Sequence, residues 1–149
     1  MSEKKLKDNL SILNRERVNL YIFKGDASLY RSAKSGIAPL IEAVEKLGTA
    51  ELSGSTVVDK VVGKAAALII SYFQAREVYT HLISRSATKV LDKNRIAFYF
   101  ERLTDEIKSR NGLGICPFES AVKEIDEPKV GYEKLRKLLR EKMVSRLKG

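Results

Sequence analysis

Cysteine and histidine are scarce in this chain, which has one of each among 149 residues. One cysteine excludes an internal disulfide framework. One cysteine and one histidine also exclude a zinc site built from these ligands within one chain, so we expect no metal. We also expect no cofactor. No stretch approaches the roughly 20 apolar residues of a membrane span, and the start of the chain lacks an apolar signal region. We therefore expect a cytoplasmic protein with no membrane partner.

The overall composition is that of a globular protein, with 44% hydrophobic and 32% charged residues. A chain of this length can bury about two-thirds of the surface that it exposes when unfolded. The absence of an internal repeat or a low-complexity linker predicts a single domain over residues 1–149, with an N-terminal helix within residues 1–16.

Positive charge is concentrated at the C-terminal end. Of the formal net charge of +9, residues 129–149 carry +6, with eight basic and two acidic groups. Apolar residues at helical spacing in the same segment predict a basic, amphipathic final helix. Such a helix can attract a nucleic acid through its charge, but a solvated lysine and arginine face explains the same pattern.

The order of periodic segments predicts an α/β fold. Two short apolar runs flank the turn at Lys24–Asp26 and predict a β-hairpin. After it, strands alternate with helices, which favours parallel pairing and a mixed sheet between helical layers, a three-layer α/β/α sandwich. We expect helices at 3–15, 37–47 (closed by Gly48), 65–73, 86–92, 103–109, 117–125 and 129–149, and strands at 18–23, 27–31, 55–58, 77–83 and 96–100.

The junction between the strand at 55–58 and the apolar helix after it is the first candidate site. A helix that begins directly after a strand directs its free amide groups toward the carboxyl edge of the sheet, where open α/β sheets hold ligands. Lys60 and Lys64 add positive charge, Gly63 allows close approach, and Asp59 adds an acceptor. This chemistry suits a phosphate or a carboxylate. The alternative is that Asp59 caps the helix and both lysines extend into water.

A phosphate-binding P-loop is excluded at this junction. Ala65 stands where that motif requires the magnesium-binding serine or threonine, and no glycine lies five residues before Gly63.

The second candidate site is the segment from Arg110 to Glu119. A proline at position 117 predicts the first turn of a helix and places Cys116 at its N-cap, where the dipole favours a thiolate. Cys116 is therefore the candidate catalytic residue, as a nucleophile or redox thiol, although a lone cysteine is more often a small hydrophobe. Glu119 lies where a capping carboxylate reaches back to its own helix, and we also place it near the ligand site.

Two motifs together resemble the uncharacterised prokaryotic family named domain of unknown function 1893. They are Val57-Val-Asp-Lys-Val-Val-Gly-Lys-Ala-Ala-Ala67 and Asn111-Gly-Leu-Gly-Ile-Cys-Pro117, and the likeness covers about residues 17–140. The resemblance implies an α/β/α sandwich like that of the cytidine deaminases. It implies no biochemical activity.

The zinc motifs of the deaminases are absent from this sequence. Those enzymes need a histidine or cysteine followed by glutamate at one helix start, and Pro-Cys-x-x-Cys at the next. The corresponding starts read Gly36-Ile-Ala-Pro-Leu40 and Asp59-Lys-Val-Val-Gly-Lys64. His81, in a predicted central strand, fits a core position better than a ligand or a base. Deamination by the zinc mechanism is therefore not expected.

Three functions follow from these observations. The first is binding of a small anionic ligand, a nucleotide or a phosphorylated metabolite, by Asp59, Lys60, Gly63, Lys64 and Glu119. The second is association with nucleic acid through the final helix. The third is an interaction module, for example a homodimer formed through the first or last helix. The sequence leaves open whether the protein is an enzyme.

Overall fold

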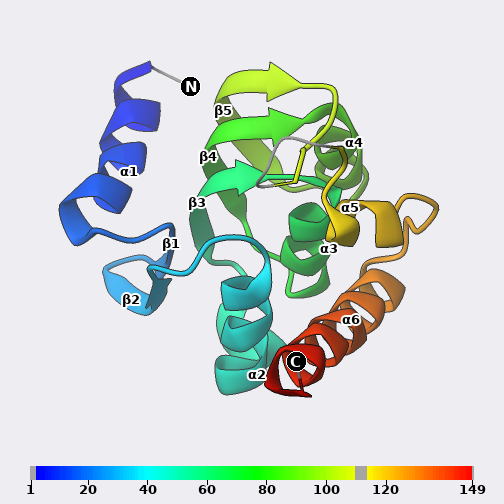
Figure 1. The fold of residues 1–149 in the computed structure, drawn as a ribbon. Helices are drawn as coiled ribbons and strands as arrows, with labels where there is room; N and C mark the ends of the chain where they lie inside the picture. Colours follow the sequence, from blue (N-terminus) through cyan, green and yellow to red (C-terminus); the bar gives the residue numbers. More distant parts are fainter. Residues whose placement is uncertain (1–2, 110–113, 149) are drawn as a thin grey trace.

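A mixed five-stranded sheet forms the centre of the molecule (Figure 1). The computed structural model describes residues 3–109 and 114–148. The strand order is β2-β1-β3-β4-β5; β1 pairs antiparallel with both β2 and β3, whereas β3, β4 and β5 are parallel. The strands are β1 (Leu20–Lys24), β2 (Ala27–Ser32), β3 (Thr56–Val62), β4 (Glu77–Ser84) and β5 (Ala97–Thr104).

Helices cover both faces of this sheet. One face packs against α1 through a small cluster that includes Leu13, Val58 and Tyr79. The other face packs against α2, α3 and α4, and α6 lies against α3 (Figure 1). This arrangement confirms the predicted α/β/α layers. The helices are α1 (Glu3–Glu16), α2 (Ala38–Leu52), α3 (Lys64–Tyr72), α4 (Arg85–Lys93), α5 (Pro117–Ala121) and α6 (Pro128–Lys148).

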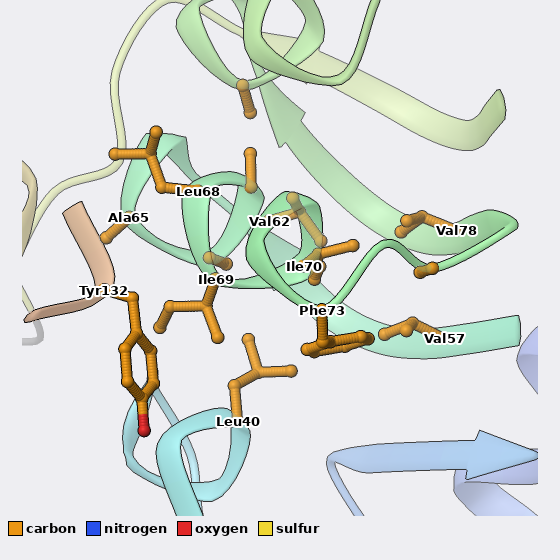
Figure 2. Packing of buried hydrophobic residues seen from close by; sticks show 14 of the residues in the cluster. Leu40, Val57, Val62, Ala65, Leu68, Ile69, Ile70, Phe73, Val78 and Tyr132 are labelled. Atoms are coloured by element: carbon orange, nitrogen blue, oxygen red, sulfur yellow. The ribbon is translucent and has the colours of Figure 1, made fainter. Parts of the chain in front are cut away.

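Helix α3 is the centre of the larger core. Every residue from Ala65 to Ser71 is buried, because the sheet lies on one side and α2, α4 and α6 surround the rest. Figure 2 shows its side chains directed toward Leu40 of α2, Val57 and Val78 of the sheet and Tyr132 of α6. A helix enclosed in this way must be apolar on all sides, which explains the unbroken apolar sequence. Its first residue is consequently fixed firmly at the end of β3.

Several predicted boundaries are wrong. Strand β3 continues to Val62 instead of ending at 58, and β5 continues to Thr104, where we expected a helix over 103–109. The pairing of β3 with β4 extends to Val62 and Ile83, so long-range backbone hydrogen bonds outweigh the local turn signals. Gly48 has a φ of 80° inside α2, so it kinks the helix instead of ending it.

Other local predictions are confirmed or corrected by single contacts. Ser84 caps α4, because its Oγ accepts a hydrogen bond from the amide of Ala87 at 3.2 Å. His81 does not occupy the core; it is partly exposed on β4, and its Nδ1 pairs with a carboxylate oxygen of Glu101 on β5. Helix α5 ends at residue 121, four residues earlier than predicted. No helix in the described part of the chain is long and apolar enough to cross a membrane.

Candidate functional site

Asp59 lies within β3 and not at the start of a helix. Its partners in the sheet are Leu20 of β1 and Thr80 of β4. The residue that precedes the first turn of α3 is Gly63, with extended backbone angles and no side-chain cap. The interpretation of Asp59 as a helix cap is therefore wrong. Because Asp59 is paired with strands on both sides, the central sheet holds its backbone in a fixed position.

A pocket of about 380 Å³ opens beside the carboxyl-terminal half of β3. Its volume falls in the range of ordinary small-molecule sites. The structure brings five of the six predicted site residues together in its lining: Asp59, Lys60, Gly63, Cys116 and Glu119. Much of the remaining wall is apolar, and it comes from Ile37, Val61, Ala66, Ile107 and Phe118.

The Asp59 carboxyl is the unusual group in this pocket. The residue is only 6% exposed, and its Oδ2 has no hydrogen-bond partner. Burial raises the pKa of Asp59 to about 8, although the backbone amides of Lys60 and Val61 partly oppose that shift. The side chain is therefore largely protonated at neutral pH. A buried polar atom without a partner is uncommon in folded proteins, and it marks Asp59 for a functional explanation.

The side-chain carboxylate of Glu119, a residue of α5, lies at the N-terminus of α3. Its two carboxylate oxygens accept hydrogen bonds from the backbone amides of Lys64 and Ala65, each at 2.7 Å. Desolvation raises the pKa of Glu119, and these amides and the charge of Lys64 act in the opposite direction. The carboxylate thus satisfies the free amides as an external anion would. We expected Glu119 to cap its own helix, α5, but its side chain caps α3 instead.

Gly63 is needed for this arrangement. A Cβ added at residue 63 would contact Oε1 of Glu119 and would lie 2.6 Å from its Cδ and 2.8 Å from Cγ1 of Ile107. Its φ of −97° is accessible to any residue, so the requirement for glycine comes from the space that Glu119 fills.

Lys64 is also occupied by the chain itself. It is 8% exposed, and its Nζ donates to the carbonyl oxygen of Lys123 at 2.9 Å and pairs with Asp126 Oδ1 at 3.0 Å. Lys64 lines a second pocket of about 210 Å³ that shares Ile107 and Glu119 with the first. The predicted anion site at the first turn of α3 is therefore filled by an internal carboxylate.

Lys60 and Cys116 lie at the edge of the first pocket. Lys60 is exposed and is the only lysine among the described residues of its lining. Because it follows Asp59 in a strand, its Cβ points to the opposite face of the sheet, and only its long stem can bring the ammonium group to the mouth. Cys116 is partly exposed, and its amide donates to the carbonyl oxygen of Ile107 at 3.2 Å. The helix it precedes has five residues, too short for a strong dipole.

The apolar wall was not predicted from the sequence. Ile107 and Phe118 reach the pocket because the chain turns back after β5, with an antiparallel bridge between Lys108 and Ile115. No local pattern indicates this return. Residues 110–113 of the predicted loop lie outside the described residues.

The basic charge of α6 is partly neutralised. Glu45 of α2 accepts from Arg136 at 3.2 Å and from Arg140 at 3.5 Å. Two cations of the predicted nucleic-acid surface are thus already paired. Within residues 3–109 and 114–148, no cluster of three or more histidine, cysteine, aspartate or glutamate side chains is arranged to hold a metal.

Comparisons with known proteins agree with the predicted family. The family model described as domain of unknown function (DUF1893) matches residues 9–139. The crystal structure of a DUF1893 family protein from Thermotoga maritima has a TM-score of 0.78 and 28% sequence identity, and the match covers 95% of this chain and 92% of that one. No curated protein matches the chain.

Proposed function

We propose that this chain, which belongs to the DUF1893 family, binds a small anionic ligand in the pocket beside β3. The ligand class is a nucleotide or another phosphorylated metabolite. The similar solved structure supports the fold, and the proposal of a ligand depends on the pocket itself. The relation to the cytidine deaminases stays a prediction.

One observation carries the proposal: a buried carboxyl with an unpartnered oxygen lies in a pocket of ligand size. Burying a polar group without a hydrogen bond costs about 1–3 kcal/mol in proteins. That cost is recovered when a ligand supplies the missing partner. Apolar walls from Ile37, Ile107 and Phe118 suit the body of a small organic molecule.

The anionic group of the ligand belongs at the mouth of the pocket, near Lys60. The amides at the start of α3 are bonded to Glu119, and Lys64 is bonded to Asp126 and Lys123. Lys60 is the only lysine among the described residues of the lining, and we place the phosphate at the rim, where the long side chain of Lys60 can turn toward it. Gly63 lines the pocket, whereas Lys64 then acts by holding the surrounding structure in place and not through direct contact.

Catalysis by Cys116 stays a prediction within this proposal. Cys116 lies in the same lining as Asp59, so a bound ligand is within the space that this residue borders. Replacing Cys116 with serine separates an enzyme from a binding module: a thiol enzyme loses turnover while ligand binding persists.

Nucleic-acid binding through α6 and a homodimer are the alternative functions. The pairing of Arg136 and Arg140 with Glu45 lowers the charge that α6 offers to a polyanion. Asp59 in the pocket has an oxygen without a partner, whereas Arg136 and Arg140 of α6 are already paired with Glu45. We therefore favour the pocket as the functional site.

The proposal is tested by titrating AMP, ribose 5-phosphate and inorganic phosphate into the protein and following the melting temperature and binding heat. A ligand that binds only the native state raises the melting temperature. At least one of the organic phosphates should stabilise the wild-type chain, and Lys60→Met should weaken that binding about tenfold or more. The matched control is Lys24→Met, an exposed strand lysine outside the pocket.

The outcomes separate the alternatives. If none of the three compounds raises the melting temperature or gives a binding heat, the proposal is wrong. Equal binding by the Lys60→Met and Lys24→Met variants contradicts the placement of the anion. If the wild-type chain binds duplex DNA and loses this binding when Arg136, Lys137 and Arg140 are replaced, nucleic-acid binding through α6 is favoured instead.

A further inference from the structure

Asp59 and its surroundings also indicate what the enclosed end of the ligand carries. Resting on the proposed function, we infer that the inner end of the ligand is a planar nitrogen group, an amidine or similar N–H donor, that binds the Asp59 carboxyl. The ligand class is therefore one with an N–H-rich inner end and an anionic outer end.

The interior of the pocket is rich in hydrogen-bond acceptors. Two carboxyl groups, those of Asp59 and Glu119, belong to its lining. The Nδ2 of Asn19, another lining residue, already donates to the carbonyl oxygen of Ala33 at 2.8 Å. The amide donors of α3 are used by Glu119. The Oδ2 of Asp59 is thus left without a partner from the chain, and a donor on the ligand can supply one.

An anionic group at the inner end is disfavoured by the same contacts. It would approach the Glu119 carboxylate, and like charges in a poorly solvated pocket repel each other strongly. A cationic or N–H-bearing group instead gains a charge-assisted hydrogen bond with Asp59. The lining residues Phe118, Ile37 and Ile107 favour an apolar body, such as an aromatic ring, behind that group.

Binding of such a group changes the protonation of Asp59. The carboxyl is largely neutral in the free protein and ionises when a cation binds, so affinity increases with pH. The other titratable groups in the described lining are Lys60, Cys116 and Glu119. Since about a tenth of a group with pKa 8 is ionised at pH 7, the gain from pH 7 to about pH 9 is roughly tenfold.

Three aromatic probes of equal size test this inference: benzamidine, benzamide and benzoate. Ligand-observed NMR should show that benzamidine binds at least about tenfold more tightly than benzoate at pH 7, with benzamide between them. Benzamidine affinity should rise between pH 7 and about pH 9. Equal or tighter binding of benzoate overturns the inference.

Asp59→Asn and Asp105→Asn are the matched variants. Asp59→Asn keeps the size of the side chain and should abolish both the preference for benzamidine and its pH dependence. Asp105→Asn removes an exposed carboxylate that lines only the second pocket and should leave both unchanged. If Asp59→Asn does not fold, the pH dependence of the wild-type protein still decides the question.

The two proposals fail in different ways. Binding of organic phosphates without any preference for benzamidine overturns this inference and leaves the proposed function standing. A preference for benzamidine without binding of any organic phosphate overturns the proposed function and keeps the nitrogen group. Failure of every probe overturns both.

Discussion

Two buried carboxyl groups line the same pocket and have opposite surroundings. Glu119 accepts two amide hydrogen bonds of 2.7 Å from the start of α3. Asp59 lies in the central strand with an oxygen that has no partner. A satisfied buried carboxylate connects parts of the fold, whereas an unsatisfied one costs stability unless something else binds it. From this comparison we expect Glu119 to stabilise the fold, and we propose Asp59 as the residue that binds the ligand.

The largest expected effect concerns the satisfied carboxylate. Glu119→Ala leaves two amides of α3 without their acceptor and should lower the free energy of unfolding by about 2–4 kcal/mol, since bonds to charged groups are the stronger kind. Urea denaturation measures it. Glu124→Ala, an exposed glutamate on the same segment, is the control and should change stability by less than about 0.5 kcal/mol. Equal effects of the two substitutions would remove the distinction.

The unsatisfied carboxyl predicts a pH dependence of stability. Folding raises the pKa of Asp59 from its ordinary value of 3.8 to about 8, so the folded chain binds more protons between these values. Stability contributed by this group is therefore lost as pH rises through that window, by at most about 1.4 kcal/mol per pH unit. Between pH 5 and about pH 7, wild type should lose roughly 2 kcal/mol more than Asp59→Asn. Parallel curves for the two proteins would contradict this assignment.

Gly63→Ala tests the contact that holds Glu119 in place. The added methyl group would overlap the Glu119 carboxyl and Ile107, so we expect a loss of about 1–3 kcal/mol, as in other overpacked sites. In the Glu119→Ala background the same substitution should cost less, because the obstructing carboxyl is gone. Additive losses in a double-mutant cycle would show that the two residues act independently.

The smallest effect is expected at the surface of α6. Glu45→Gln removes the partner of Arg136 and Arg140, whose pairs with Glu45 are solvent-exposed. Such pairs contribute about 1 kcal/mol or less, so unfolding in urea should change only slightly. A large loss would indicate that α6 is held on α2 by charge and not by its apolar contacts with α3.

The layered fold was predictable because the spacing of apolar residues within each segment indicates a helix or a strand, and this spacing can be read from neighbouring residues in the sequence. The hairpin, the buried helix α3 and the alternation of strands and helices follow from such patterns. The extension of β3 through Val62 was not predictable, because it depends on pairing with β4, a distant strand.

The candidate site shows the same division. Five of the six predicted residues meet in one pocket, because Asp59 to Gly63 are consecutive or nearly so and the Cys116 segment returns to them. The local features at the start of α3, a glycine and two lysines, favoured an external anion. They could not indicate that Glu119, 55 residues away, fills that position, because tertiary contacts of this kind leave no local signal.

The central claim is that Asp59 is largely protonated in the free protein and that its Oδ2 has no partner. A ¹³C NMR titration of the side-chain carboxyl groups tests it most directly. Loss of one resonance in Asp59→Asn assigns the signal. The account predicts that this resonance titrates at a pKa of about 8. A resonance for Asp59 that titrates near 3.8 would contradict the account, since it would show a solvated or already partnered carboxylate.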